Sequence, residues 1–387
     1  MIEQLAKLVD AQMDRIVALR HRLHRCPEPG FCEVNTSRII ADELSDLGLQ
    51  VQTGIAETGI IADVAGEQEG PYVVIRADMD ALPLRESTGL DYASANEGYS
   101  HACGHDGHSA AVVGAARVLA GMRDTLRGKV RFIFQPAEEI CRGAKAMIEH
   151  GALGSNPPDA ILSLHAWPGI PVNSFACRAG TMMASCDVLN INIHGKGGHG
   201  ARPQEANNPL LGLARVVEAL TALTGEDRVV SLCVARAGRQ ANIIAGSARL
   251  SGTVRTLCPE IREQTLAEII LLAQDACAQL GLKAEVSFDG MSRSVITDQR
   301  LYGIFKEVAR ELLGENNLVE LDSPSMGSED FGMYLDHAPG LIFRVGMGVD
   351  HPGLHQADFD FADGALRTGM LVLCGMVARI CGKGPSK

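Results

Sequence analysis

Short, continuous runs of aliphatic and β-branched residues alternate with helical stretches along the first part of the chain. Three such runs cover residues 72–77, 130–135 and 160–164, and helical segments at 109–122 and 144–150 separate them. Strands without polar alternation are typical of a parallel sheet that is covered on both faces. The pattern therefore predicts βαβ units and an α/β fold with a mostly parallel central sheet.

This pattern changes near residue 183. Residues 188–194 (VLNINIH) alternate apolar and polar side chains, which is typical of a strand with one face in solvent. Further strands are predicted at 229–235, 248–255 and 284–288, with helices at 209–223 and 260–280. The βα pattern returns at about residue 292. We therefore predict a discontinuous larger domain, residues 1–182 and 292–387, and an inserted smaller α+β domain, residues 183–291.

Composition excludes several classes of protein. The 387 residues include 35 Lys and Arg against 47 Asp and Glu, a net charge of −12, whereas nucleic-acid binding needs clustered positive charge. The N-terminus follows helical spacing with charges throughout, so it has no signal-peptide core, and no apolar run is long enough to predict a membrane span. The 11 cysteines include no C-x-x-C pair, which indicates reduced thiols and a cytoplasmic protein.

The densest group of metal-ligand residue types lies in the segment SHACGHDGH, residues 100–108. It contains His101, Cys103, His105, Asp106 and His108. Cys103 and His105 are two positions apart and cannot share a helix face, but they can meet at a metal in a loop. We expect the helix to begin after Gly107, with the cluster in the loop before it. The alternative is a polar capping loop around a buried cysteine.

Polar residues also follow three of the predicted parallel strands. Asp78 and Asp80 follow the first strand, Glu138 and Glu139 the second, and His165 ends the third. Ligand sites of open α/β sheets lie outside the carboxyl ends of their strands, so these side chains are expected to converge. Alone, the glutamate pair would indicate a solvated helix start and His165 a core histidine. Together they predict a metal site in which one glutamate binds metal and the other acts as general base toward a water.

Two further histidine-containing segments leave alternatives open. Residues 195–200 (GKGGHG) match the dinucleotide pattern G-x-G-x-x-G, but the preceding strand alternates and Pro203 and Pro209 delay the helix. A glycine loop that presents His199 is the preferred interpretation. Near the C-terminus, His351 and His355 are both candidate ligands, and their spacing does not choose between them.

The motifs occur in an order that resembles a known family. The set is RADMDALP, HACGHDGH, FIFQPAEE, HAWPG, GKGGHGARP, QANIIAGSARLSGTVRT, MGSEDF and LHQADFDF. It resembles the aminoacylase/carboxypeptidase metallopeptidase superfamily, and within it the amidohydrolase branch of hippurate hydrolases and indole-acetyl-amino-acid hydrolases. The resemblance covers about residues 20–375. It implies a catalytic domain with a dinuclear metal site and an inserted lid that also forms a homodimer or a dimer of dimers.

The resemblance also implies roles for individual residues. The implied metal ligands are Cys103, His105, Glu139, His165 and His355, with Cys103 bridging two divalent ions as a thiolate. His355 is preferred to His351 because the family's histidine lies four residues before a phenylalanine, here Phe359. Manganese or zinc is expected, and cobalt or nickel is compatible with the same donors.

Other implied roles concern catalysis and substrate binding. Glu138 would be the general base, Asp78 would orient a ligand, and His199, from either subunit, would polarise the scissile carbonyl. Asn242 and Arg255 would hold the substrate carboxylate. The chain departs from the family pattern at Gln204, at residues 140–143 and at residues 356–357, which affects the expected specificity rather than the ligand set.

The expected function is metal-dependent hydrolysis of N-acyl amino acids such as N-acetyl, N-benzoyl or indole-acetyl conjugates. A dipeptidase or carboxypeptidase of the same mechanism is the alternative. Competing classes are a nucleotide-dependent oxidoreductase using residues 195–200, a non-catalytic metal-binding protein, and a thiol-redox role for Cys103. Structural zinc sites usually close with four ligands, so five donors and a spare carboxylate favour a catalytic site.

Overall fold

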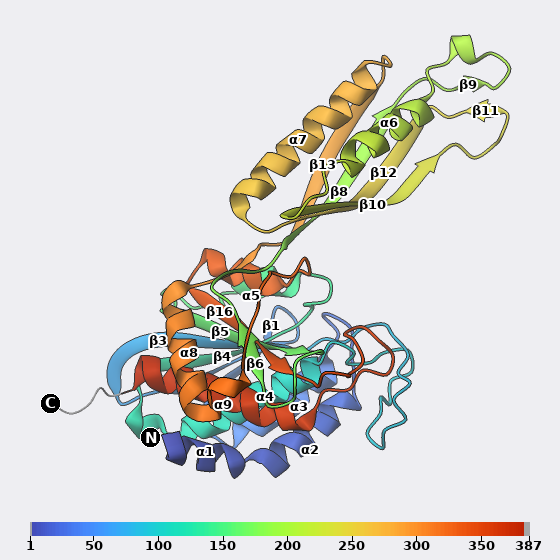
Figure 1. The fold of residues 1–387 in the computed structure, drawn as a ribbon. Coiled ribbons are helices and arrows are strands. Elements are labelled where there is room, and N and C mark those ends of the chain that lie inside the picture. The colour runs from blue at the N-terminus through green and yellow to red at the C-terminus, as the bar shows by residue number, and fades with distance from the viewer. Residues whose placement is uncertain (1, 383–387) are drawn as a thin grey trace. The chain divides into compact units, whose positions relative to one another are not determined.

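The computed structural model describes residues 2–382, which form two compact units (Figure 1). The first unit comprises residues 1–182, 296–323 and 333–387, and the second comprises residues 183–295 and 324–332. The sequence analysis places residues 324–332 with the larger domain, whereas the structure groups them with the smaller unit. The sequence of this short segment has no strand or helix pattern that would indicate that it belongs with the smaller unit.

An eight-stranded sheet forms the centre of the first unit, in the order β1-β2-β4-β3-β5-β16-β6-β15. Its strands are β1 (Gln50–Ile55), β2 (Gly59–Ala65), β3 (Gln68–Asp78), β4 (Arg127–Gln135), β5 (Ala160–Trp167), β6 (Phe175–Cys177), β15 (Leu318–Glu320) and β16 (Gly340–Gly346). Strands β4, β3, β5 and β16 are parallel neighbours, whereas β1 and β2 are antiparallel. The predicted α/β fold with a mostly parallel sheet is confirmed, although β1 and β2 were not predicted.

Helices pack against this sheet, and most of them lie on the face to which alternate strand residues point, such as Val73, Ile75 and Ala77 of β3 (Figure 1). One core cluster joins it to α1 (Ile2–Asp10), α2 (Met13–His24), α3 (Val34–Ser45), α4 (His105–Gly121), α8 (Gln299–Leu313) and α9 (Asp363–Cys381), and the short α5 (Gly143–Glu149) contacts β4. The helical spacing of the N-terminus belongs to two helices rather than one, because the chain turns at Ala11 and Gln12 between α1 and α2.

Helix α9 is the one described helix that is long and apolar enough to cross a membrane by length and composition. The sequence analysis did not single it out, because Asp363, Arg367 and Arg379 interrupt it. Most of the helix is buried inside the first unit, where it packs against α4. Burial on nearly all sides accounts for its apolar composition.

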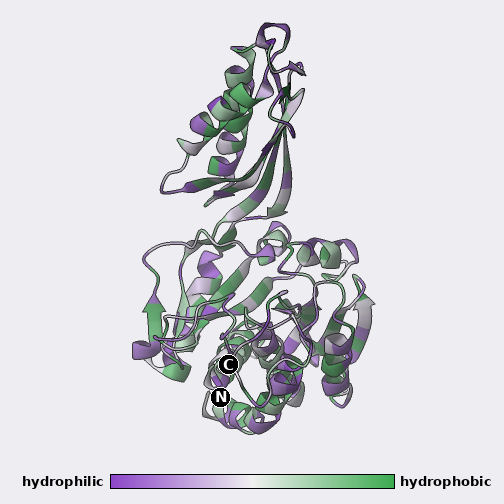
Figure 2. Ribbon diagram, turned by 90° about the vertical axis from the view of Figure 1, so that its right-hand side faces the viewer, coloured by the Kyte–Doolittle hydropathy of each residue, from purple (hydrophilic) through white to green (hydrophobic). Residues whose placement is uncertain are grey.

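The second unit is an antiparallel four-stranded sheet with two helices packed against it. Its strands lie in the order β10 (Arg228–Ala237), β12 (Ser247–Thr256), β8 (Ser185–His194) and β13 (Lys283–Ser292), and its helices are α6 (Pro209–Thr221) and α7 (Pro259–Ala278). Leu189, Ile191 and Ile193 are buried in its core, whereas Asn192 and His194 are exposed. Hydrophobic and hydrophilic colours alternate along these strands in Figure 2.

Shorter strands complete the chain. The small ladder of β9 (Gly198–His199) and β11 (Ile243–Ile244) belongs to the second unit. The chain passes between the units at four points, and strands β7 (Gly180–Met183) and β14 (Val295–Thr297) span the first two of them.

Candidate metal centre

Three parallel strands deliver polar side chains to the same edge of the large sheet. Strand β3 ends at Asp78, which pairs in register with Gln135 at the end of β4. His165 lies near the end of β5, the neighbour of β3 on its other side. Because parallel strands place their carboxyl ends together, residues from three distant parts of the sequence meet here, as the sequence analysis expected.

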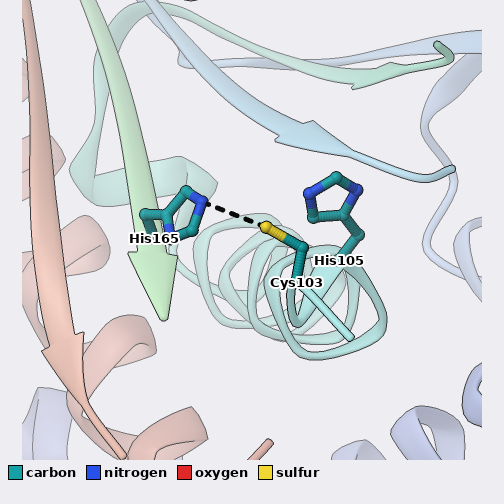
Figure 3. Close-up of side chains that lie close together, drawn as sticks. All are labelled: Cys103, His105 and His165. Carbon is teal, nitrogen blue, oxygen red and sulfur yellow. Dashed lines mark hydrogen bonds between the residues drawn. The ribbon is translucent and has the colours of Figure 1, made fainter. Parts of the chain in front are cut away.

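The metal-ligand cluster of residues 100–108 joins this edge at the start of α4 (Figure 3). The helix begins at His105 rather than after Gly107, so the prediction that the whole cluster lies in a loop is wrong. Gly104 precedes it with a φ of 87°, in the left-handed region that glycine adopts without strain. This turn lets Cys103 and His105 approach one centre, with the Cys103 Sγ atom 3.7 Å from His165 Nε2.

Two groups of three donor atoms share the Cys103 thiol, and the atoms of each group lie within 4.8 Å of one another. The first group is Cys103, His105 and His165, and the second is Cys103, Glu139 and His355. The Glu139 carboxylate connects them, with Oε1 3.7 Å from His105 Nε2 and Oε2 3.6 Å from His355 Nε2. All five side chains of the ligand set implied by the resemblance therefore meet in the first unit.

Backbone hydrogen bonds orient two of these histidines. His105 Nδ1 lies 2.9 Å from the Asp80 carbonyl oxygen, and His165 Nδ1 lies 2.7 Å from the Ala166 carbonyl oxygen. A ring nitrogen that donates to a carbonyl leaves the other nitrogen, Nε2, with a lone pair for a metal. The buried His105 Nε2 and Glu139 Oε1 have no hydrogen-bond partner within residues 2–382. Unpaired buried polar atoms facing one point fit a bound cation.

Glu138 lies beside this cluster. Its Oε2 atom is 3.9 Å from His105 Nε2, and its side chain is buried. His105, Glu138 and Glu139 form a further group of donor atoms within 4.8 Å of one another. The two adjacent glutamates thus both approach His105, and Glu139 also approaches His355.

His108 and Asp78 lie next to the cluster and form hydrogen bonds there. His108 Nδ1 is 2.7 Å from Asp78 Oδ1, and its Nε2 accepts the backbone N–H of Ala166 at 2.7 Å. With both ring nitrogens in use, His108 is a positioning residue rather than a ligand. Arg76 donates to Asp78 Oδ2 at 2.7 Å. Burial alone would raise the pKa of Asp78, but His105, His108 and Arg76 outweigh it and hold that pKa well below its usual range.

Two carboxylates fix the loop that carries the adjacent glutamates. Asp80 accepts the backbone N–H groups of Glu138 and Glu139, each at 3.0 Å. Glu33 accepts the N–H of Ala137 at 2.9 Å, and Ala137 has the unfavourable φ of 55°. The sequence predicts Asp80 at this edge of the sheet but not this role. It gives no signal for Glu33, which lies in a separate segment of the chain and carries no motif.

The last ligand candidate comes from a loop near the C-terminus. His355 has a φ of 63°, and its backbone N–H donates to the Ala102 carbonyl at 2.8 Å, next to Cys103. His351 is in none of the donor groups found among the described residues, and its Nδ1 contacts the Pro352 carbonyl. The geometry therefore favours His355, the residue chosen by resemblance.

Burial dominates the electrostatics of the cluster. It raises the pKa of the Glu139 carboxyl to about 7, against the opposing effect of His105, and it raises the pKa of the Cys103 thiol. For His105, burial lowers the pKa but the Asp78 carboxylate outweighs it, so the pKa is raised. Protons on these groups compete with a cation for the same atoms, so cation binding here must release protons.

The remaining candidates lie in the second unit. His199 and Asn242 are neighbours, because the Gly200 N–H donates to the Asn242 carbonyl at 2.8 Å where β9 pairs with β11. The exposed His199 accepts the Ala201 N–H at Nδ1. Arg255 is half-buried on β12 and donates to the Met326 carbonyl and the Ser328 hydroxyl at 3.0 and 3.2 Å.

The glycine loop of residues 195–200 does not have the geometry of a dinucleotide site. It follows β8, the antiparallel neighbour of β12 and β13, and continues into the short strand β9. A dinucleotide fingerprint requires a parallel strand before the loop and a helix that starts inside it. The next α-helix begins only at Pro209.

Comparisons with known proteins identify relatives along nearly the whole chain. Residues 74–379 match the family described as Peptidase family M20/M25/M40. A probable hydrolase of Synechocystis sp. is 39% identical over 96% of both chains. N-acetyl-L-cysteine deacetylase of Bacillus subtilis is 35% identical over 89% of this chain and 83% of its own.

A solved structure agrees as well. The YXEP protein of Bacillus subtilis, described as a dinuclear metal binding peptidase of the M20 family, superposes with a TM-score of 0.86 and 32% identity. The alignment covers 96% of this chain and 99% of that one. This chain belongs to peptidase family M20/M25/M40.

Proposed function

We propose that this chain is a metal-dependent amidohydrolase that cleaves the amide bond of N-acyl amino acids. The observation that carries the proposal is the Cys103 thiol, which belongs to two donor groups at once while the Glu138 carboxylate lies beside them. Five donors with an additional carboxylate suit a catalytic site better than a closed structural one. The deacetylase relative acts on an N-acyl amino acid, which supports this substrate class.

The donor set fits two divalent cations. Cys103, His105, His165, Glu139 and His355 would hold them, with the Cys103 thiol common to both donor groups, and Asp78 would orient the site through His108. The thiolate and imidazoles suit zinc, and the carboxylate also accepts manganese, cobalt or nickel. When bound, the cations polarise the substrate carbonyl and lower the pKa of a water toward neutrality.

The chain's own residues supply the proton transfers and the binding contacts. Glu138 accepts a proton from the attacking water and passes it to the leaving amine. His199, from this subunit or from the partner of a homodimer, donates a hydrogen bond to the carbonyl oxygen as negative charge develops on it. Asn242 and Arg255 hold the carboxylate of the amino acid. The proposed setting is the cytoplasm, with a dimer formed through the second unit.

The test is release of a free amino acid from a panel of N-acetyl, N-benzoyl and indole-acetyl amino acids and several dipeptides. Each assay is run with a chelator and again after addition of manganese or zinc. We expect chelator-sensitive release that returns with metal. Preference for dipeptides would support the dipeptidase alternative. Absence of release by a protein shown to contain two metals would overturn the substrate class.

A matched pair of cysteine variants tests the metal centre itself. We expect Cys103→Ala to lose bound metal, because both donor groups share this thiol. Cys374→Ala removes another buried thiol, whose Sγ contacts the Ala115 carbonyl in the core, and it should keep both metals. Metal content is read by mass spectrometry of the purified proteins. Equal metal content in the two variants would remove Cys103 from the ligand set.

A further inference from the structure

A cavity of about 960 Å³ lies in the second unit on the polar face of its four-stranded sheet. It is bounded by β8, β10 and β12 and by the segment that leads through β11. Its polar and charged lining side chains are Asn192, His194, Arg236, Arg239, Gln240, Ser247 and Arg249. It therefore has three arginines and no carboxylate in its wall.

Two of these arginines are placed directly opposite each other. Arg236 on β10 pairs in register with Arg249 on β12, and Arg249 pairs with Asn192 on β8. All three side chains are exposed on the same face. Like charges at directly opposed positions of neighbouring strands destabilise a sheet. The opposed pair of Arg236 and Arg249 therefore destabilises the sheet unless negative charge neutralises it.

No acidic side chain in the described part of the chain neutralises these arginines. Arg249 donates at 2.9 Å to the neutral side-chain oxygen of Asn190, and Arg236 and Arg239 make no hydrogen bond or ion pair within residues 2–382. The acidic residue nearest in register is Glu285 on β13, which pairs with Asn192. Its carboxylate already forms ion pairs with His194 at 3.2 Å and Lys283 at 2.7 Å.

Other arginines of the same unit do have acidic partners. Arg262 binds Asp187, Arg228 binds Glu268 and Arg202 lies near Glu205. Residues 183–295 carry 11 Lys and Arg and 11 Asp and Glu, so acidic side chains are not scarce in this part of the chain. The cavity is therefore a local excess of positive charge within a chain of net charge −12.

We propose that this cavity binds a small anion with at least two negative charges on carboxylate or phosphate-like groups. Guanidinium groups match both chemistries through paired, charge-assisted hydrogen bonds. The cavity volume is in the range of small-molecule sites. An anion bridging Arg236 and Arg249 would also convert their mutual repulsion into attraction.

The test titrates the full-length, metal-loaded protein with succinate, sulfate and acetate by calorimetry in a zwitterionic buffer at low ionic strength. We expect saturable binding of about one succinate or sulfate per chain and much weaker binding of acetate. Stronger succinate binding assigns a dicarboxylate and stronger sulfate binding a tetrahedral oxyanion. No saturable binding of either dianion would overturn the proposal.

Three arginine variants separate a site from general charge attraction. Arg236→Ala and Arg249→Ala should each weaken binding at least about tenfold, the effect of losing one charge-assisted contact. Arg215→Ala removes the same charge from α6, where the exposed Arg215 donates to Gln279 at 3.1 Å, and should change affinity less than about twofold. Equal weakening in all three variants would overturn the site.

Stability supplies a second readout, independent of hydrolysis. Without added anion, Arg236→Ala should unfold at the wild-type temperature or above it, because it relieves repulsion and breaks no hydrogen bond. The same anion concentration should raise the unfolding temperature of the wild type clearly more than that of the variant. A clear loss of stability in anion-free Arg236→Ala would assign the arginine a structural role instead.

Discussion

The two units of the molecule place their reactive side chains in opposite environments. In the first unit, the strands β3, β4 and β5 are buried toward their ends, and His105, His165 and Glu138 lie there almost without solvent contact. In the second unit, His199, Asn242 and Arg236 are exposed on a ladder and a polar sheet face. Buried reactive groups need a surrounding network to hold them, whereas exposed groups are replaceable without loss of fold.

The network of the first unit extends well beyond the donors. Arg20, fully buried on α2, contacts Asp106 at 3.4 Å and Asp360 at 2.5 Å, and so joins the start of α4 to the loop that follows His355. Breaking such a buried pair is strongly destabilising. In the second unit, Arg202 and Glu205 form a 3.7 Å pair with both side chains mostly exposed, and such pairs contribute little.

The largest effect is expected for Glu138→Gln. Removing the proton acceptor should lower kcat by about 10²- to 10⁴-fold, the usual contribution of a general base. The isosteric amide should leave bound metal unchanged. The measurements are steady-state kinetics and metal content. The matched control is Glu149→Gln, an exposed position on α5, which should keep full activity. Full activity of Glu138→Gln would remove the base assignment.

The corresponding change in the second unit is His199→Ala. We expect kcat to fall about 10²- to 10³-fold, as for loss of an oxyanion donor, with an unchanged urea midpoint because the side chain is exposed. His194→Ala, exposed on β8 and paired with Glu285, is the control and should keep its activity. A large loss of stability in His199→Ala would contradict the contrast between the units.

If the proposed dimer forms, mixing the two inactive variants tests which subunit supplies the histidine. If His199 acts in the partner's site, subunits of Glu138→Gln and His199→Ala exchanged into one dimer restore part of the activity. One site then has an intact Glu138 together with an intact His199. If both residues act within one chain, every mixed dimer stays inactive.

Glu33→Gln tests how the buried network responds to pH. Burial raises the pKa of the Glu33 carboxyl from 4.5 to about 7, although Thr58 and the backbone donate hydrogen bonds to it. Between pH 4.5 and pH 7, the Glu33 carboxyl therefore takes up a proton when the chain folds. The stabilising effect is complete below pH 4.5 and is lost as the pH rises through 7, on the order of 3 kcal/mol in the free energy of unfolding.

The amide cannot ionise, so Glu33→Gln should remove this dependence of the free energy of unfolding on pH. Urea denaturation of the metal-loaded wild type and variant at intervals from pH 5 to pH 8 measures it. The wild type should lose stability relative to the variant as the pH rises. Parallel profiles for the two proteins would show that Glu33 does not titrate in this range.

Much of the first unit could be predicted because local pattern and topology agree there. The apolar runs at β3, β4 and β5 identify buried strands without any partner information, and parallel pairing then forces Asp78, Glu138 and His165 to one edge. The segment around Cys103 adds its ligand types within a few positions, so the candidate site follows from short-range information. The five-donor set was implied by resemblance, and the donor distances agree with it.

What could not be predicted depends on contacts between distant segments. Glu33 reaches the Ala137 backbone from 104 positions away, and Arg20 reaches Asp360 across 340. Neither residue has a motif or a periodic position that indicates its partner. The unpaired arginines of the second unit are likewise visible only once register places Arg236 beside Arg249. The start of α4 was misjudged because Gly107 suggested a break, whereas Gly104 provides the turn.

The smallest effects on the free energy of unfolding are expected from two helix caps. They test whether the two units unfold independently. Asn208 accepts the Leu210 N–H at the start of α6, and Asp298 accepts the Leu301 N–H at the start of α8. Replacing either by alanine should cost about 1 kcal/mol. Each unit has its own core cluster, so we expect two calorimetric transitions, with Asn208→Ala lowering one and Asp298→Ala the other. A single transition that both variants shift equally would mean that the two units unfold together.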